Sequence, residues 1–286
     1  MQKHIFKKKY GQHFLYDLNL LKLIIKQANL DNQNVIEIGP GKGTLTRLML
    51  NKAKKILLYE IDSSLKPFLI FDKKIPIKII YDDFLNRNLE DDLQKFFQKE
   101  DVVLIGNLPY YITTPLLFKI IFLNQIKNFT IMIQKEIGLR LMALPKNKNY
   151  NALSVLIQTL TKIKKIKIVK KTMFYPQPKV DGIILRFEKK SFQIEELNFI
   201  KKEFYIFVKA AFTHKRKNLF NNLNSFFKIP KNKLLIFFQI NHINPNIRGE
   251  EISVSQFLNI TSLFFDFVNK FNFIPNIQNF FLKIKK

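Results

Sequence analysis

Cysteine is absent from the 286 residues of the chain. Its absence excludes disulfide bonds, cysteine-ligated zinc, iron–sulfur clusters and thiol nucleophiles. A reducing cytoplasm is the simplest location for such a chain, and it is the location that we expect. Apolar runs of 18 residues are missing too, and no apolar stretch follows the lysine-rich residues 1–10. We therefore expect neither a membrane span nor a signal peptide.

Acidic residues are scarce relative to basic ones. The chain has 22 Asp and Glu against 48 Lys and Arg, which gives a formal net charge of +26. Clustered cations bind polyanions strongly because they release condensed counterions, so this charge favours a nucleic-acid partner. However, Asn, Ile, Lys and Phe are all abundant, as translation of an AT-rich genome would produce. The charge by itself leaves both explanations open.

The composition indicates a folded chain, because 47% of the residues are hydrophobic and 30 are Phe. Apolar runs bounded by turn residues recur along the first half of the chain, with helical periodicity between them. This alternation predicts parallel strands with crossover helices. The predicted strands are Val35–Ile38, Ile56–Tyr59, Ile77–Ile80, Val102–Ile105 and Phe129–Ile133.

The rhythm changes after residue 143. Residues 162–171 and 180–187 resemble a closing antiparallel pair joined by a proline-containing loop, and from Glu195 onward the apolar spacing is helical. We therefore predict an α/β domain at residues 1–190, with a basic N-terminal arm at 1–17, and a smaller all-helical domain at 191–286.

A glycine-rich turn follows the first predicted strand. Gly39, Gly41 and Gly43 would let a ligand approach the backbone closely, and the next helix would offer free amide donors. The spacing G-x-G-x-G differs from the G-x-G-x-x-G of dinucleotide-binding proteins, which argues against NAD. A purely structural turn stays open as an alternative.

Acidic residues end the next two predicted strands. Glu60 lies about 20 residues beyond the glycine turn, where nucleoside-binding α/β proteins place an acid that accepts hydrogen bonds from ribose. Asp82 and Asp83 follow the third strand, where a carboxylate could accept from an adenine amino group. Because open sheets bind ligands at the carboxyl ends of their strands, these positions favour a nucleoside site.

The tetrad Asn107-Leu108-Pro109-Tyr110 ends the fourth predicted strand. An exocyclic aromatic amine is a poor nucleophile, since its lone pair is delocalised into the ring. The Asn107 side-chain oxygen and the Leu108 carbonyl could hold such an amine in a reactive orientation while Tyr110 stacks on the base. This is catalysis by positioning and electrostatics. A turn that merely ends a strand is the alternative.

With these motifs in place, the chain resembles the ribosomal RNA adenine dimethyltransferase family, in particular the small-subunit members whose loss gives kasugamycin resistance. The matching segments span nearly the whole chain in the family's order: 8–15, 37–41, 60–62, 106–110, 134–136, 174–181 and 248–253. Two departures lie outside the proposed chemistry, namely Gly182 where Ser is usual and the lack of a Gly after Tyr150.

The resemblance implies a Rossmann-like class I methyltransferase fold and S-adenosylmethionine as methyl donor. It implies two adjacent dimethyladenosines near the 3′ end of small-subunit rRNA as the product, each adenine being taken out of its stack to react. By the same resemblance, Phe174 sandwiches the target base together with Tyr110. The residues implied to contact the donor are His13, Leu15, Gly39, Gly41, Glu60, Asp83 and Asn107.

Two other functions stay open at this point. One is the large-subunit rRNA methyltransferase of the macrolide-resistance type, whose amine motif is typically Asn-Ile-Pro-Tyr. The other is a non-catalytic RNA-binding assembly factor, although neither the glycine turn nor the tetrad is decayed. We expect a monomer that binds a pre-ribosomal particle. We expect no metal site, since no histidines have ligand spacing.

Overall fold

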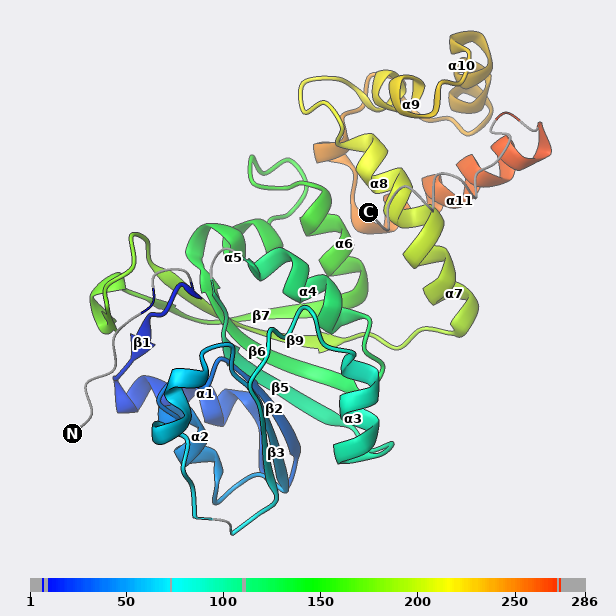
Figure 1. Cartoon of the computed structure of the whole chain (residues 1–286). Helices are drawn as coiled ribbons and strands as arrows, with labels where there is room; N and C mark the ends of the chain where they lie inside the picture. The colour runs from blue at the N-terminus through cyan, green and yellow to red at the C-terminus, as the bar shows by residue number, and fades with distance from the viewer. Residues whose placement is uncertain (1–6, 8–9, 73, 110–111, 272, 274–286) are drawn as a thin grey trace. The chain divides into compact units, whose positions relative to one another are not determined.

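The computed structural model describes residues 7, 10–72, 74–109, 112–271 and 273 (Figure 1). The chain divides into two compact units. The first contains Met1–Gly138 and Thr161–Lys189, and the second contains Leu139–Leu160 and Lys190–Lys286. Residues 139–160, predicted from the sequence to belong to the first domain, group with the second unit. The reason is long-range packing, because helix α6 (Ala152–Leu160) packs on α8 (Tyr205–Ala211) and α11 (Val254–Lys270).

A seven-stranded sheet forms the centre of the first unit, with the order β4-β3-β2-β5-β6-β9-β7 (Figure 1). The five strands from β2 to β6 are parallel, whereas β9 runs antiparallel to both β6 and β7. Both the parallel sheet and the closing antiparallel pair are thereby confirmed. The strands are β2 (Asn34–Ile38), β3 (Lys55–Tyr59), β4 (Ile77–Ile80), β5 (Val102–Asn107), β6 (Ile126–Gln134), β7 (Thr161–Val169) and β9 (Gly182–Lys189).

The strand order creates a switch point between β2 and β5. From β2 the chain proceeds outward through β3 to β4, then returns to the other side of β2 with β5. Crossover connections therefore leave in opposite directions from these two strands, and a crevice opens at their carboxyl ends. The ends of β2 and β5 carry the glycine turn and Asn107, respectively.

Helices connect the strands of the first unit. Helix α1 has an apolar stripe that packs on β6 and β9, and its N-cap Asp17 accepts a hydrogen bond from the Leu20 N–H at 2.7 Å. The helices are α1 (Leu18–Ala28), α2 (Thr44–Met49), α3 (Leu89–Phe97) and α4 (Thr113–Ile121), with short 3₁₀ helices at Ser63–Phe68 and Lys171–Met173.

A second, two-stranded sheet was not predicted. Strand β1 (Phe14–Leu15) pairs antiparallel with β8 (Phe174–Tyr175), with Phe14 opposite Tyr175 and Leu15 opposite Phe174. Two residues per strand are too few to show a period in the sequence. The pairing joins the N-terminal segment to the proline-containing loop of the same unit.

The second unit is helical in its described residues beyond 190, as predicted. Its core is built from phenylalanine: Phe207, Phe237, Phe257 and Phe264 are each 0% exposed. None of the helices in the described part of the chain is long and apolar enough to cross a membrane. Helix α5 (Lys135–Leu141) begins in the first unit, and the second contains α6, α7 (Ile194–Phe199), a wider turn at Ile200–Phe204, α8, α9 (Leu219–Phe227), α10 (Lys231–Ile240), a tight turn at Gly249–Glu251, and α11.

Candidate active site

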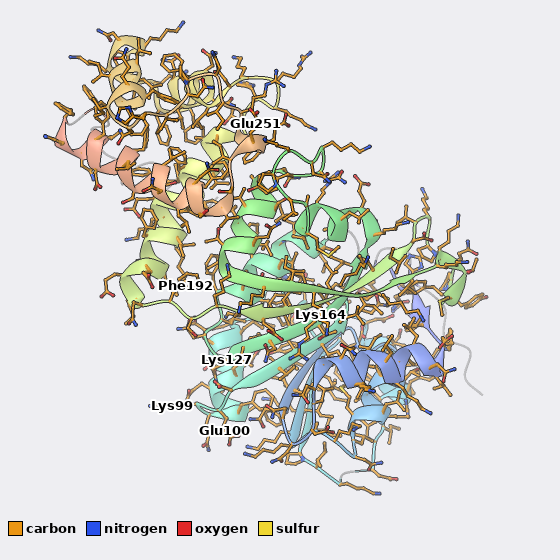
Figure 2. All side chains as sticks on the ribbon, turned by 180° about the vertical axis from the view of Figure 1, so that it is seen from behind. Lys99, Glu100, Lys127, Lys164, Phe192 and Glu251 are labelled. Carbon is orange, nitrogen blue, oxygen red and sulfur yellow. The ribbon has the colours of Figure 1, made fainter. Side chains whose placement is uncertain are left out.

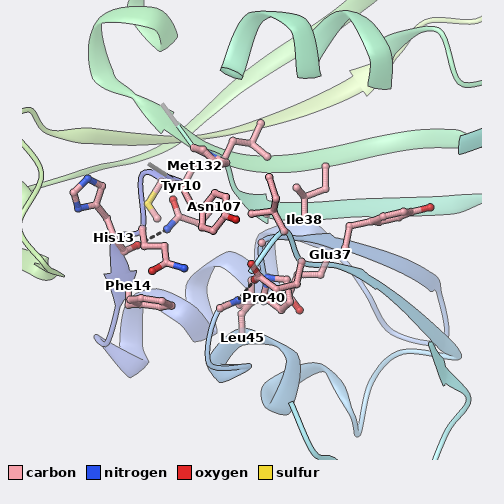
Figure 3. Close-up of a pocket in the computed structure, with 18 of the residues that line it drawn as sticks. Tyr10, His13, Phe14, Glu37, Ile38, Pro40, Leu45, Asn107 and Met132 are labelled. Carbon is pink, nitrogen blue, oxygen red and sulfur yellow. Dashed lines mark hydrogen bonds between the residues drawn. The ribbon is translucent and has the colours of Figure 1, made fainter. Parts of the chain in front are cut away.

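A pocket lies in the first unit, at the carboxyl ends of β2 to β5 (Figure 3). Seven residues implied by the resemblance to contact the donor line it, together with Leu108 and Pro109 of the tetrad. The seven are His13, Leu15, Gly39, Gly41, Glu60, Asp83 and Asn107. The structure therefore brings together residues from five separate segments of the sequence.

The glycine turn forms the floor of the pocket next to the N-terminal segment. Gly41 has a φ of 59°, in the left-handed region, and a Cβ atom there would lie 2.4 Å from the Phe14 ring. Glycine is required at this position for both reasons. The Gly41 N–H also donates a 3.1 Å hydrogen bond to Glu60 Oε2, so the turn and the acid are held together.

Glu60 lines the pocket at the end of β3 and is 4% exposed. Burial raises the pKa of its carboxyl to about 7, although hydrogen bonds from the backbone N–H groups of Asp62 and Gly41 oppose the shift. Each carboxylate oxygen accepts one of these bonds and retains a second lone pair. A pair of adjacent ribose hydroxyls could therefore donate to the same carboxylate.

Glu37 also lines the pocket and was not among the predicted site residues. It lies in β2, is 2% exposed, and accepts a 2.6 Å hydrogen bond from the Thr46 hydroxyl. Burial raises the pKa of Glu37 to about 8, against the lowering effect of the Thr46 bond. The signal in the sequence is a glutamate inside an otherwise apolar strand.

Asp82 and Asp83 lie at the next rim of the pocket. Asp83 Oδ1 accepts from the Leu85 N–H at 2.9 Å, and Asp82 Oδ1 accepts from the Asp83 N–H at 2.8 Å. These local bonds set the turn after β4. Lys119 of α4 holds the same turn from outside by donating to the carbonyls of Leu85 and Arg87 at 2.5 and 2.7 Å.

Asn107 has a defined amide orientation. Its Nδ2 donates a 2.8 Å hydrogen bond to the backbone carbonyl of His13 (Figure 3). Because the nitrogen of the amide is engaged in this bond, Oδ1 is the side-chain atom that can accept from a ligand. The tetrad therefore presents an acceptor to the pocket, as an amine substrate requires.

His13 connects three segments. Its carbonyl accepts from Asn107, while its ring Nδ1 lies 2.6 Å from the carbonyl oxygen of Pro176 in the proline-containing loop. A carbonyl can only accept, so the ring carries its proton on Nδ1 in this contact. The ring thus fixes the segment that in turn orients Asn107.

The N-terminal segment supplies further pocket residues that sequence reasoning did not identify, namely Tyr10, Gln12 and Phe14. Buried Asp62 anchors this segment by accepting from Lys7 Nζ at 2.5 Å and from Gln12 Nε2 at 2.7 Å. Burial alone would raise the pKa of Asp62, but the hydrogen bonds from Lys7, Ser64 and Gln12 outweigh it and hold the pKa at about 2.

Of the two predicted base-stacking residues, the structure describes Phe174 and does not describe Tyr110. Phe174 is 4% exposed, packs in the apolar cluster with Leu15 and Ile184, and does not line the pocket. Tyr110 lies outside the described residues. Within the described part of the chain, no group of three or more His, Cys, Asp or Glu side chains could hold a metal ion.

A parallel sheet with a switch point, a glycine turn bonded to the buried Glu60, and the Asn107 amide at the pocket edge are typical of a Rossmann-like methyltransferase. Comparison with known proteins gives the family. The model described as ribosomal RNA adenine dimethylase matches residues 3–266, and the chain belongs to this family. It is an rRNA adenine dimethyltransferase that uses S-adenosylmethionine as methyl donor.

Relatives agree with this assignment over almost their whole length. A protein of Phytoplasma australiense named ribosomal RNA small subunit methyltransferase A is 51% identical over 98% of this chain and 99% of the relative. One of the same name from Bacillus cytotoxicus is 39% identical over 88% and 89%. The crystal structure of a dimethyladenosine transferase from Plasmodium falciparum has a TM-score of 0.72 at 25% identity, covering 89% of this chain and 98% of that one.

The donor fits the residues present. Glu60 offers acceptor oxygens for ribose hydroxyls, and the absence of a side chain at Gly39 and Gly41 leaves backbone exposed toward the pocket. Asp62, whose pKa is lowered to about 2, already accepts hydrogen bonds from Lys7 and Gln12. A positively charged sulfonium donor is compatible with this acidic, mostly apolar pocket.

Proposed function

We propose that the enzyme dimethylates the exocyclic amines of two adjacent adenines near the 3′ end of small-subunit rRNA, within a pre-ribosomal particle in the cytoplasm, and that it acts as a monomer. The names of the relatives, which specify the small subunit, support this choice over large-subunit rRNA. The large-subunit enzyme ErmE shares the fold with a TM-score of 0.64 at 23% identity, which is evidence for the fold alone. A non-catalytic assembly role would not require an oriented Asn107.

The observation that carries the proposal is the orientation of Asn107 by the His13 carbonyl. In the proposed reaction, Oδ1 of Asn107 and the carbonyl of Leu108 accept hydrogen bonds from the two amine hydrogens of the adenine. These bonds direct the nitrogen lone pair at the methyl group. S-adenosylmethionine, when bound, would supply that methyl group as an electrophile: its C–S bond would break as the C–N bond forms, a neutral thioether would leave, and the amine proton would pass to water.

The donor is proposed to lie between the glycine turn and the two acidic strand ends. Glu60 accepts from the ribose, Asp83 from the adenine amino group of the donor, and His13, Leu15, Gly39 and Gly41 enclose it. Tyr110 and Phe174 are proposed to stack on the flipped base. For Phe174 this requires the ring to leave the apolar cluster with Leu15 and Ile184, since it is 4% exposed without substrate.

The second unit, which contains the predicted helical domain at residues 191–286, is proposed to dock the ribosomal particle. A hollow in this unit supports the idea, because Arg140, Lys148, Lys215 and Lys217 line it against a single acid, Glu250. Positive side chains around a concave surface suit phosphate groups.

Methyl transfer to under-methylated small subunits tests the proposal, with large subunits and duplex DNA as parallel substrates and mapping of the modified bases. Dimethyladenosine at paired adenines of small-subunit rRNA is expected. Label in large-subunit rRNA would favour the macrolide-resistance activity. Absence of label with measurable particle binding would favour a non-catalytic factor.

A further inference from the structure

We propose that strand β7 is a docking surface for the RNA backbone, which leads the substrate strand toward the active site. The proposal rests on the proposed function, because it assigns a surface of the catalytic unit to the same rRNA substrate. Three lysines of β7, Lys162, Lys164 and Lys167, carry it, and we refer to them as the lysine row.

The lysine row lies in the most basic stretch of the first unit. β7 is the last strand in the sheet order, so one of its edges has no neighbouring strand (Figures 1 and 2). Residues 162–171 contain six lysines and no acid, and all six lysines are exposed. The six are Lys162, Lys164, Lys165, Lys167, Lys170 and Lys171.

The three lysines of the row point to one face of the sheet. Their partners on β9 are Glu188, Arg186 and Ile184, which alternate along that strand and so share a face. A register shift between Lys165 and Lys167 brings Lys167 onto the face of Lys164. Without that bulge, the row would be interrupted.

The positive charges of these lysines are not neutralised by ion pairs on this face of the sheet. Arg186 is directly opposite Lys164, a like-charge arrangement that destabilises a sheet. Glu188, the one acid on this part of β9, lies opposite Lys162 in the register, but its ion pair is with Arg186 at 3.2 Å. No described acid forms an ion pair with any of the six lysines. An external polyanion would remove this repulsion.

Other lysines of the same unit behave differently. Lys52 pairs with Asp31 at 2.8 Å, Lys95 with Asp91 at 2.7 Å, and Lys127 with Asp101 at 3.5 Å. A composition bias toward lysine would act equally on both groups. It therefore does not explain why one group has acidic partners and the other forms an uncompensated row.

The chain that follows the lysine row leads from β7 to the pocket. Lys170 and Lys171 follow directly after β7 and lead into β8, which pairs with β1. Leu15 of β1 lines the pocket, and the next residue of the loop after β8, Pro176, holds His13. A strand of RNA that follows β7 toward its carboxyl end therefore arrives at the segment that orients Asn107.

The chemistry of the row suits phosphates along a single strand. Residues two apart in a strand are roughly 6.6 Å apart, which is comparable to the separation of successive phosphates. Lysine is a flexible point charge that contacts phosphates without reading bases. Sequence preference would then come from the pocket, and the row would contribute affinity and direction.

The test neutralises the row and compares it with a matched control. The variant K162Q/K164Q/K167Q and the control K52Q/K95Q/K127Q change the net charge equally. RNA affinity is measured against salt concentration with an rRNA fragment that contains the target adenines. We expect the row variant to bind about tenfold more weakly at low salt, with a salt slope smaller by about 2, at roughly 0.7 per single-strand phosphate contact. The control should retain the wild-type slope.

Further readouts separate this proposal from its alternatives. Replacing the three lysines by arginine should restore RNA affinity, and donor affinity should be unchanged in all variants. An equal loss in row variant and control would mean that only net charge matters. Aggregation of the row variant with wild-type RNA affinity would mean that the lysines only protect a sheet edge. Either result overturns the docking surface, whereas failure of the wild-type enzyme to methylate small subunits would instead overturn the proposed function.

Discussion

The two units bury different kinds of side chain. All the buried carboxylates among the described residues belong to the first unit: Glu37, Glu60, Asp62 and Asp92. The buried polar side chains of the second unit are uncharged: Ser154, Thr159, Asn222 and Thr261. Burying a charge is unfavourable unless hydrogen bonds compensate it, so a cluster of buried acids indicates a unit selected for chemistry.

The apolar cores of the two units also differ in composition. Ile, Leu and Val dominate around the sheet, whereas the second unit packs phenylalanine rings edge to face, such as Phe237 against Phe264 at 5.5 Å between ring centres. The aromatic core has no buried ionisable acid to accommodate. The comparison predicts that replacing a core ring of the second unit lowers the stability, and that replacing a pocket residue of the first unit lowers the rate of methyl transfer.

The largest expected effect is the loss of a central ring of the second unit. Phe264 is 0% exposed and contacts Phe207, Phe227 and Phe237. Phe264→Ala should lower the free energy of unfolding by about 3–5 kcal/mol, since a large cavity forms. Calorimetry measures this, with Phe264→Leu as a milder control. A large change in the donor affinity of the folded variant would contradict the expectation that this core residue of the second unit affects stability alone.

A comparable loss, in the rate of methyl transfer instead of stability, is expected at Asn107, the residue of the first unit that is proposed to bind the amine. Asn107→Ala removes the oriented acceptor and should lower the rate of methyl transfer by about 10²–10³-fold, while donor affinity falls much less. Single-turnover methyl transfer and donor titration separate the two quantities. Turnover near that of the wild-type enzyme would contradict catalysis by positioning.

Much of the first unit was predictable because its signals are local. Apolar runs such as Ile77–Ile80 became β4 without a change of bounds, and the acids at strand ends came together because parallel strands share an edge. The contact between His13 and Pro176 could not be predicted, since its partners are 163 residues apart and join strands of two residues. The grouping of residues 139–160 with the second unit depends on packing against α8 and α11, which leaves no local pattern.

A smaller effect is expected when the ring of His13 is replaced. His13→Leu loses the donor to the Pro176 carbonyl and should lower kcat about tenfold through a less constrained Asn107, with a smaller change in KM. His13→Asn should restore most of the rate, because its amide nitrogen can occupy the position of Nδ1 and donate to the same carbonyl. Equal loss in both variants would exclude this positioning role.

The smallest expected effect concerns the anchor of the N-terminal segment. The pKa of Asp62 is about 2 in the folded state, against an ordinary value of 3.8, so its interactions stabilise the fold above about pH 4 and are lost as the pH falls toward 2. Lys7→Met removes one of the donors and should destabilise the protein at neutral pH by less than about 1 kcal/mol, because the Lys7 side chain is 36% exposed.

Urea unfolding of the Lys7→Met variant and the wild type between pH 2 and 5 measures this. The two stabilities should approach each other as the pH falls toward 2, where about half of the Asp62 carboxyls in the wild type are protonated. Lys52→Met is the matched control, because it also removes a lysine from an ion pair, but its partner Asp31 is exposed and the loss should change the stability little. A difference in the free energy of unfolding between wild type and Lys7→Met that stays constant over the whole pH range would show that Lys7 stabilises the fold through packing. The ion pair between Lys7 and the buried Asp62 carboxylate would then not be what anchors the N-terminal segment.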